Sequence, residues 1–256
     1  MRKLICLLVA AACLATATGV ASADDRYVAL GDSYSAGTGS GPYTLDARCQ
    51  RSPSAYPYLE SRARPGTTLV FVACAGATTT DVLDSQLAAL TPQTRLASIT
   101  IGGNDAGFSG VVRACVTIGC PPAILRAAAF VRAELPRRLD AVYDAIRRRA
   151  PDATVAVLGY PRLFGATGCA ATIGVITTER RRLNQLADLL DATIARRAAA
   201  HGFHYLSAIA RFARHPVCAH DGWLHGIVPF SASESFHPTS RGHADGYLPL
   251  LRSALG

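Results

Sequence analysis

The sequence predicts one α/β domain in which a parallel β-sheet is covered by helices on both faces. Short runs rich in β-branched residues alternate along the chain with longer helical patterns, an order typical of parallel sheets with right-handed crossovers. The runs lack strict alternation of polar and apolar residues, which indicates strands buried on both faces. The chain has 256 residues and is 50% hydrophobic, so it can bury a substantial core.

The expected elements follow one another in regular alternation. Strands are expected at 27–30, 68–73, 96–101, 154–158 and, with a weaker pattern, 203–209. Helices are expected at 53–64, 80–90, 123–149, 177–200 and 239–255, with Pro136 kinking or dividing the third. Ligands of open α/β sheets bind beyond the carboxyl ends of the strands. The turns that contain Gly31, Gly76, Gly102 and Gly159 therefore mark the expected site.

The first 23 residues have the layout of a secretory signal peptide. Arg2 and Lys3 precede an apolar run, and the small residues Ala21, Ser22 and Ala23 follow it. A membrane anchor is the alternative, but the apolar run is shorter than the roughly 20 residues that span a bilayer. We therefore expect cleavage after Ala23, a single mature domain over residues 24–256, and secretion.

The cysteine content agrees with export. Two of the eight cysteines, Cys6 and Cys13, lie in the expected signal peptide, and the rest form an even set suited to an oxidising compartment. Spacing makes the local pair Cys115–Cys120 plausible, with Cys49–Cys74 and Cys169–Cys218 as the accompanying pairs. A structural zinc site is the alternative, but the sequence has no Cys-x-x-Cys pair.

The charge balance is basic, with a formal net charge of +8, or 8 − 2 = +6 once Arg2 and Lys3 are removed. Such an excess can indicate nucleic-acid binding, but the basic residues are dispersed, as at 147–149 and 180–182, with no aromatic residues between them. We interpret them as solvated helix faces with a secondary attraction to anionic surfaces, and we expect no nucleic-acid partner. Polyanion binding through these arginines is a separate hypothesis.

A candidate nucleophile follows the first expected strand. Ser33 stands in the segment Gly31-Asp32-Ser33-Tyr34-Ser35, where a glycine turn after a buried strand can present a hydroxyl at the sheet edge. A serine at this position is also a common helix cap. The segment is not the Gly-x-Ser-x-Gly elbow of α/β-hydrolases, because Ser35 occupies the position of the last glycine.

A candidate general base lies near the other end of the chain. Pro238 disfavours helix at His237, which places the imidazole on a loop before the last expected helix. A catalytic serine requires such a base within hydrogen-bonding reach. Asn104, which follows two glycines, and the Gly76 N–H could supply an oxyanion hole, although both are compatible with ordinary turns.

Together these segments resemble the SGNH (GDSL) hydrolase family. The blocks around Ser33, Gly76, Asn104 and His237 occur in the family's order and span nearly the whole expected mature chain. With its six remaining cysteines, the sequence looks closest to the secreted actinobacterial lipases, esterases and phospholipases of that family. The resemblance implies a flavodoxin-like three-layer α/β/α sandwich with a five-stranded parallel sheet.

The resemblance also implies the roles of the site residues. Ser33 would be the nucleophile and His237 the base, while the Ser33 N–H, the Gly76 N–H and the Asn104 side chain would form the oxyanion hole. No metal and no organic cofactor are implied. The enzyme would be a serine esterase or lipase that forms an acyl-enzyme on Ser33.

One position departs from the family pattern. Many members carry Asp three residues before the catalytic His, whereas this chain has Glu234. In some relatives a main-chain carbonyl two residues before the His orients the imidazole, and that residue is Ser235 here. The orienting acceptor selects the tautomer that can take the serine proton. We slightly favour the Ser235 carbonyl over the Glu234 carboxylate.

We expect no catalytic or metal-binding role for the other histidines. Five of them precede the last expected helix: His201, His204, His215, His220 and His225. Although Asp221 lies among them, their spacing lacks the i, i+4 register of a helical metal site, so we expect none. His243 is expected within the last helix.

The substrate is the least determined part of the function. Secretion and apolar content favour a lipid ester, either acylglycerol or phospholipid, and residues 108–131 are expected to form an apolar wall or lid. A carbohydrate acetyl esterase is the alternative enzyme, and a non-catalytic secreted binding protein is the alternative from another class. We expect a monomer that binds its ester substrate and transiently contacts an anionic membrane surface.

Overall fold

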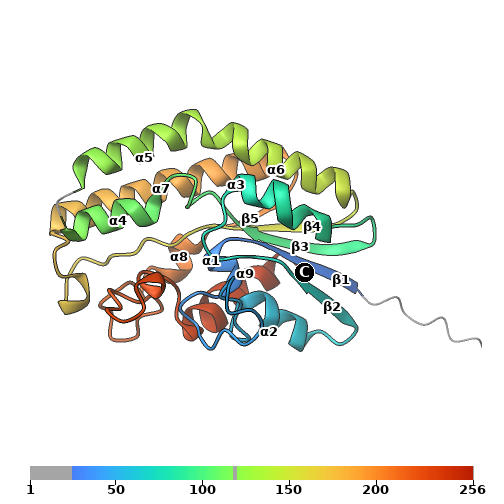
Figure 1. Cartoon of the computed structure of the whole chain (residues 1–256), viewed down its shortest axis with the longest axis horizontal. Coiled ribbons are helices and arrows are strands. Elements are labelled where there is room, and N and C mark those ends of the chain that lie inside the picture. The colour runs from blue at the N-terminus through green and yellow to red at the C-terminus, as the bar shows by residue number, and fades with distance from the viewer. Residues whose placement is uncertain (1–24, 118–119, 256) are drawn as a thin grey trace, which may run out of the picture.

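The computed structural model describes residues 25–117 and 120–255, so the expected signal peptide and its cleavage after Ala23 lie outside the described residues. A parallel five-stranded sheet forms the centre of the molecule, in the order β2-β1-β3-β4-β5 (Figure 1). Its strands are β1 (Asp25–Gly31), β2 (Thr67–Phe71), β3 (Thr94–Thr100), β4 (Thr154–Leu158) and β5 (His204–Leu206). This is the flavodoxin-like order, and the predicted fold class is confirmed.

Helices cover both faces of the sheet and make it the middle of three layers (Figure 1). One face carries α3 (Thr79–Asp81), η1 (Val82–Gln86), η2 (Leu87–Ala89), α4 (Phe108–Thr117), α5 (Pro121–Ala133), α6 (Leu135–Arg149) and α7 (Thr177–Ala200). The other face carries α2 (Tyr56–Ala63), α8 (Ala208–Phe212), η5 (Gly242–Tyr247) and α9 (Leu248–Ser253). The short helices α1 (Ser33–Ala36), η3 (Ala170–Thr172) and η4 (Ala232–Glu234) lie in connecting segments.

The central strands are buried on both faces. In β1 every residue from Tyr27 to Gly31 is buried, and in β3 every residue from Leu96 to Thr100. The absence of polar alternation in these runs therefore reflects helices packed on either side. Among the described residues, no helix combines the length and the hydropathy that a membrane span needs.

Several expected elements differ in extent. The strand expected at 203–209 ends at Leu206, because the Ser207 hydroxyl caps α8 by accepting a hydrogen bond from the Ile209 N–H at 3.3 Å. The helix expected at 123–149 is divided into α5 and α6, and Pro136 stands in the first turn of α6, where no N–H donor is needed. Residues 108–117, for which the sequence predicts part of an apolar wall or lid and no helix, form the helix α4.

The described residues contain three disulfides. They connect Cys49 to Cys74, Cys115 to Cys120, and Cys169 to Cys218. Because each of these sulfur atoms is bonded to another, none of the six remains as a thiolate ligand for zinc.

Candidate active site

The turn after β1 positions Ser33. Gly31 ends the strand with φ +118, and a Cβ there would lie 2.4 Å from the Thr100 carbonyl oxygen, so this position requires glycine. Asp32 then caps α1, its carboxylate accepting a hydrogen bond from the Tyr34 N–H at 3.0 Å. Ser33 is the first residue of α1, and no described residue accepts a hydrogen bond from its N–H. This N–H is therefore available to a ligand.

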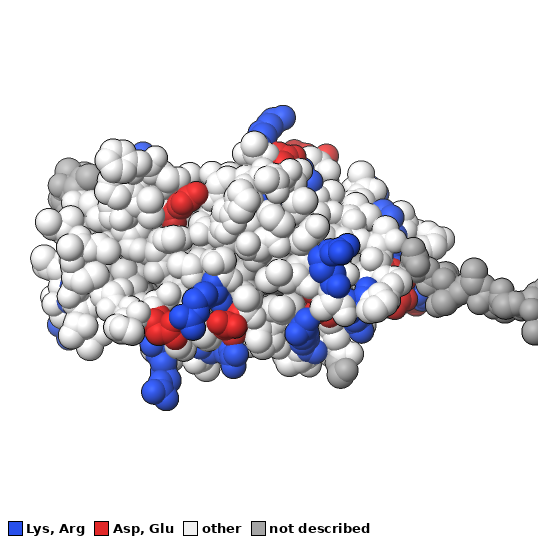
Figure 2. Space-filling view, turned by 90° about the horizontal axis from the view of Figure 1, so that it is seen from below, with Lys and Arg blue, Asp and Glu red and all other residues white. Residues whose placement is uncertain are grey.

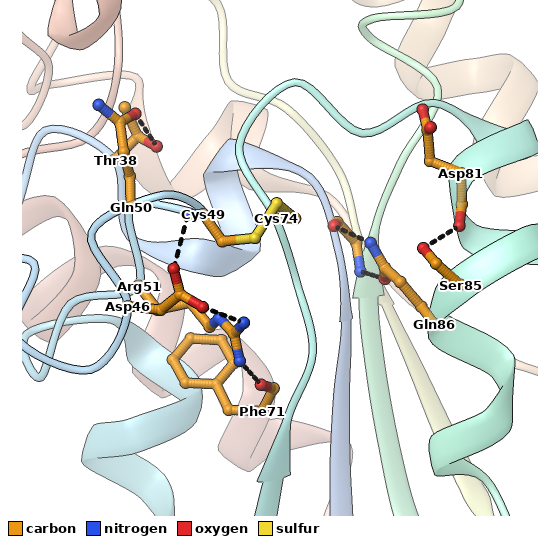
Figure 3. Close-up of a disulfide and its surroundings, with 11 residues drawn as sticks. Thr38, Asp46, Cys49, Gln50, Arg51, Phe71, Cys74, Asp81, Ser85 and Gln86 are labelled. Carbon is orange, nitrogen blue, oxygen red and sulfur yellow. Dashed lines mark hydrogen bonds and ion pairs between the residues drawn. A yellow bond between two sulfur atoms is a disulfide. The ribbon is translucent and has the colours of Figure 1, made fainter.

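A buried glutamine holds the backbone just before this turn. Gln86, 3% exposed, accepts a hydrogen bond from the Gly31 N–H at 2.7 Å and donates one to the Gly31 carbonyl at 2.9 Å. The Cys74 N–H also donates to that carbonyl, at 3.0 Å, and Cys74 is joined to Cys49 by a disulfide (Figure 3). Sequence reasoning did not find Gln86, because a single glutamine in a helix carries no motif.

Hydrogen bonds to two neighbouring segments position the loop of His237. The His225 N–H donates to the His237 carbonyl at 2.9 Å. Phe236 adopts φ +64, and its carbonyl accepts a hydrogen bond from the Tyr34 hydroxyl at 2.8 Å. Since Tyr34 follows Ser33 directly, this bond connects the loop of the expected base to the helix of the expected nucleophile.

Ser33 and His237, 204 positions apart, meet at hydrogen-bonding distance. The Ser33 Oγ and the His237 Nε2 are 2.7 Å apart. On the other side of the ring, Nδ1 lies 3.1 Å from the Ser235 carbonyl oxygen. Because a carbonyl oxygen can only accept, Nδ1 carries the proton and Nε2 accepts from the serine hydroxyl. The pair therefore has the arrangement that general-base catalysis requires.

The Glu234 carboxylate is engaged elsewhere. Its Oε1 accepts a hydrogen bond from the Tyr43 hydroxyl at 2.5 Å. Within the described part of the chain, no hydrogen bond joins this carboxylate to the His237 ring. Of the two acceptors considered from the sequence, the geometry favours the Ser235 carbonyl.

Burial keeps the imidazole of His237 neutral. Desolvation lowers the pKa of His237 from 6.5 to about 4, although the hydrogen bond to Ser235 acts in the opposite direction. At neutral pH the ring is therefore in the form that accepts a proton. His243, which lies in η5 as part of the last helical stretch, is fully buried, and burial lowers its pKa to about 3.

The other two expected oxyanion donors lie on the turns after β2 and β3. Asn104 lines the same cavity as Ser33, and its Nδ2 donates to the Ala77 carbonyl at 2.9 Å, which orients the amide and leaves one N–H unused. Gly76 adopts φ +82, and no described residue accepts a hydrogen bond from its N–H. Gly76 is not among the residues that line the cavity. The structure thus places Asn104 on the same cavity as Ser33. Gly76 directly precedes Ala77, whose carbonyl orients the Asn104 side chain.

Two buried carboxylates join these turns to one another. Asp105 accepts hydrogen bonds from the N–H of Thr79, at 2.9 Å, and from its hydroxyl. Asp32 accepts one from the Tyr160 hydroxyl, which itself accepts from the Gly103 N–H at 3.0 Å. Burial raises the pKa of Asp32 from 3.8 to about 7. Sequence reasoning noted the turn after β4 but did not find Tyr160.

A cavity of about 380 Å³ lies beside the serine and histidine pair. Helix α4, within the segment expected to form an apolar wall, contributes Phe108, Val112 and Val116 to its lining, whereas α5 contributes none. Other apolar lining residues are Leu163, Leu190, Ile227 and Phe236. The volume and the lining are typical of a site for a small apolar ligand.

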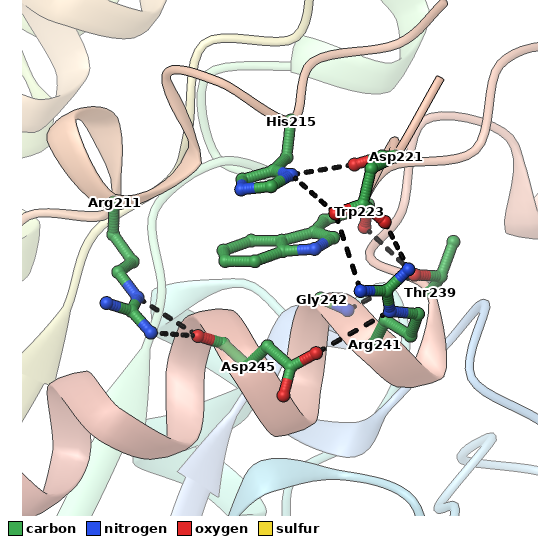
Figure 4. A network of polar contacts seen from close by, with 8 residues as sticks. All are labelled: Arg211, His215, Asp221, Trp223, Thr239, Arg241, Gly242 and Asp245. Carbon is green, nitrogen blue, oxygen red and sulfur yellow. Dashed lines mark hydrogen bonds and ion pairs between the residues drawn. The ribbon is translucent and has the colours of Figure 1, made fainter. Parts of the chain in front are cut away.

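The remaining histidines do not gather around a common point. His215 stacks on Trp223 with ring centroids 3.7 Å apart, and its Nδ1 bonds the Asp221 carbonyl at 2.7 Å (Figure 4). His201 instead contacts Asp140 at 3.0 Å. Over residues 25–117 and 120–255, no group of three or more His, Cys, Asp or Glu side chains has the arrangement of metal ligands.

A parallel sheet in the order β2-β1-β3-β4-β5, with a serine directly after β1 in contact with a histidine shortly before the last helices, is the arrangement of SGNH-type hydrolases. The chain belongs to the GDSL-like Lipase/Acylhydrolase family, whose sequence model matches residues 29–244. It is 45% identical over 238 residues to Lipase 1 of Streptomyces coelicolor, and this alignment covers 91% of this chain and 88% of that protein. The family resemblance predicted from the sequence is confirmed.

Two crystal structures show the same fold. The extracellular lipase from Streptomyces rimosus has a TM-score of 0.86 at 45% identity, covering 90% of this chain and 99% of its own. Phospholipase A1 from Streptomyces albidoflavus NA297 has a TM-score of 0.86 at 46% identity, covering 91% of this chain and 100% of its own.

Proposed function

We propose that this protein is a secreted serine esterase that hydrolyses the acyl esters of lipids, either acylglycerols or phospholipids. The observation that carries the proposal is the 2.7 Å contact between the Ser33 Oγ and the His237 Nε2 beside an apolar cavity. Similar proteins bear the names lipase and phospholipase A1, and both names denote carboxylic ester hydrolases.

In the first half-reaction Ser33 forms the acyl-enzyme. Its Oγ attacks the ester carbonyl carbon while the His237 Nε2 takes the hydroxyl proton. The hydrogen bond from Nδ1 to the Ser235 carbonyl holds the imidazolium in place. When the tetrahedral intermediate collapses, the bond to the alkoxide breaks and Nε2 returns the proton to the leaving oxygen.

In the second half-reaction water replaces the alcohol. His237 takes a proton from the water as the water oxygen bonds to the acyl carbon. When this intermediate collapses, the bond from the acyl carbon to the Ser33 Oγ breaks, the carboxylic acid is released, and His237 returns its proton to the Ser33 oxygen. In both halves the developing oxyanion accepts hydrogen bonds from the N–H groups of Ser33 and Gly76 and from the Asn104 side chain. Removing one donor of this kind typically lowers the rate by a factor of about 10² to 10³.

The apolar lining of the cavity supports a lipid acyl chain over a small acetyl group. An acetylated polysaccharide would present polar sugar hydroxyls, which need hydrogen-bonding partners when buried. A carbohydrate acetyl esterase is the alternative on the same fold. Fatty acid release from phospholipid vesicles, compared with acetate release from acetylated xylan, separates the two.

The sequence of the first 23 residues and the three disulfides support a location outside the cell. We infer that residues 1–23 are a signal peptide removed after Ala23, and that residues 24–256 form one domain outside the cytoplasmic membrane. The three disulfides support an oxidising compartment. The mature protein would act as a monomer that contacts anionic membrane surfaces transiently.

The substitution Ser33→Ala tests the proposal. It should abolish hydrolysis of p-nitrophenyl butyrate and leave the circular dichroism spectrum and the melting temperature unchanged, because the side chain changes by a single oxygen. Unchanged activity in this variant would end the proposal. A wild-type protein that binds lipid but cleaves no ester would instead favour the non-catalytic binding protein.

A further inference from the structure

Three large apolar side chains on two loops near the cavity have little protein around them. Ile173 is 73% exposed, Ile176 is 63% exposed, and Phe230 is fully exposed at 104%. A single exposed apolar residue is ordinary on a protein surface, whereas a group beside a binding cavity indicates an interaction site. We call these three residues the apolar rim.

The first loop, which carries Ile173 and Ile176, is held against the cavity wall. The Ala171 carbonyl accepts a hydrogen bond at 2.9 Å from the N–H of Ile227, a cavity-lining residue. Gly174 approaches the Val116 carbonyl so closely that a Cβ would lie 2.5 Å from it, and Val116 also lines the cavity. The exposed isoleucines therefore stand on a segment fixed between two parts of the cavity wall.

The second loop, which carries Phe230, is closed by its own hydrogen bonds. The Val228 N–H donates to the Ser235 hydroxyl at 2.9 Å, and the Ser231 N–H donates to the Val228 carbonyl at 3.2 Å. Phe230 lies at the tip, and Ala232, two residues further on, lines the cavity. Its exposed ring is thus carried by a hydrogen-bonded loop.

Basic residues far outnumber acidic ones in two stretches of the sequence, the second of which contains Ile173 and Ile176. The sequence has no acidic residue between Asp105 and Glu134, and only Glu179 between Asp152 and Asp188. Glu179 is 7% exposed and accepts hydrogen bonds from two backbone N–H groups, so its charge is turned inward. The same two stretches contain seven arginines: Arg113, Arg126, Arg132, Arg162, Arg180, Arg181 and Arg182.

The position of these charges suits a negatively charged partner surface. Arg181 and Arg182 are exposed in the first turns of α7, shortly after Ile176. Between Asp221 and Glu234, around Phe230, the sequence has no Asp, Glu, Lys or Arg. Both loops lie at the end of the molecule opposite the start of β1 (Figure 1), and on the face drawn in Figure 2 that end shows mainly uncharged residues.

We propose that the apolar rim docks the protein on an anionic phospholipid bilayer, with Ile173, Ile176 and Phe230 inserted among the lipids and Arg181 beside the headgroup phosphates. The inference rests on the proposed function, since it names the surface from which a lipid ester would enter the cavity. Apolar insertion combined with basic residues is the general mode of peripheral membrane binding.

The test measures binding to sucrose-loaded vesicles of phosphatidylcholine and phosphatidylglycerol by co-sedimentation. Every variant carries Ser33→Ala in addition, so that no lipid is consumed during the measurement. The triple variant Ile173→Ser, Ile176→Ser and Phe230→Ser should bind about a hundredfold more weakly than the parent. Leu83→Ser, which removes a 37% exposed leucine from η1, is the matched control and should bind as the parent does.

The electrostatic part has its own variant. Arg181→Ala should weaken binding to vesicles that contain phosphatidylglycerol by about fivefold and leave binding to pure phosphatidylcholine unchanged. An equal loss on both kinds of vesicle would contradict an attraction of Arg181 to the net negative charge of the bilayer.

Failure of the docking proposal is distinct from failure of the proposed function. With Ser33 restored, the triple variant should hydrolyse soluble p-nitrophenyl butyrate as the wild type does. If the wild type hydrolyses no ester, the esterase proposal is wrong, but the measured binding to vesicles is unaffected. If the parent does not bind vesicles, or if the triple variant binds them equally well, the proposal that the apolar rim docks on a bilayer is wrong. A parent dimer that the triple substitution dissociates in sedimentation velocity would also overturn it, because the rim would then bind a second copy.

Discussion

The Tyr160 hydroxyl donates a hydrogen bond to the buried carboxylate of Asp32, which lies 128 positions earlier in the chain. The same hydroxyl oxygen accepts from the Gly103 N–H at 3.0 Å. One phenol therefore connects the turns after β1, β3 and β4, and two of these turns carry Ser33 and Asn104. The positions of the nucleophile and of the amide donor thus depend on a side chain that the proposed reaction itself does not use.

Removal of this hydroxyl should destabilise the fold. Tyr160→Phe leaves the Gly103 N–H and one oxygen of Asp32 buried without a partner, which should lower the free energy of unfolding by roughly 2 to 4 kcal/mol. Urea denaturation followed by circular dichroism measures the change. Tyr143→Phe is the matched control, because the Tyr143 hydroxyl is buried with no described partner, and its loss should be neutral or stabilising. Equal effects of the two substitutions would contradict the role given to Tyr160.

The pH dependence of activity should follow His237. Burial lowers its pKa to about 4, so the neutral base persists well below the usual titration range of histidine. We expect kcat/KM for a soluble ester to stay level from pH 7 to about pH 5, and to fall as the pH decreases through about 4. Initial rates at low substrate concentration measure it. A fall centred near the ordinary histidine value of 6.5 would show that the ring is solvated in solution.

The protein should tolerate the loss of the Glu234 charge. Because Glu234 accepts from Tyr43 and the Ser235 carbonyl bonds the imidazole, Glu234→Gln should change kcat by no more than about threefold. Tyr43→Phe removes the partner of Glu234 and serves as the comparison. A loss of about 10⁴, the size seen when a triad carboxylate is neutralised, would identify Glu234 as the orienting group after all.

Truncation of Asn104 should reduce turnover with little effect on substrate binding. The Asn104→Ala variant loses one donor to the oxyanion, so kcat should fall by about 10² to 10³ while KM stays similar. Steady-state kinetics on p-nitrophenyl butyrate give both constants, and the melting temperature controls for loss of the Asn104 to Ala77 hydrogen bond. A change confined to KM would assign Asn104 to ground-state binding.

Much of the fold could be predicted because its signals are local and repeated. Buried parallel strands appear as continuous apolar runs, and the first four runs are each followed by a turn that contains glycine at the same edge of the sheet. Predictions failed at short or composite elements. The three-residue strand β5 is ended by the Ser207 cap, and α4 contains Ser109 and Gly110 in its first turn, which weakens a helical pattern.

The site was partly predictable for a different reason. Ser33, Asn104 and His237 stand in short segments that resemble a family, and the structure brings them to one cavity. Tyr160 and Gln86 make equally long-range contacts from single positions without a motif. Such partners are set by the packing of elements distant in sequence, which periodicity along the chain does not encode.

Reaction with a fluorophosphonate probe tests the central claim most directly. The probe forms a covalent bond only with an activated serine, and peptide mapping by mass spectrometry identifies the modified residue. We expect one adduct, on Ser33, formed at least about 10³ times more slowly in His237→Ala. Modification of another residue, or an equal rate in the two proteins, would show that Ser33 and His237 do not act as nucleophile and base.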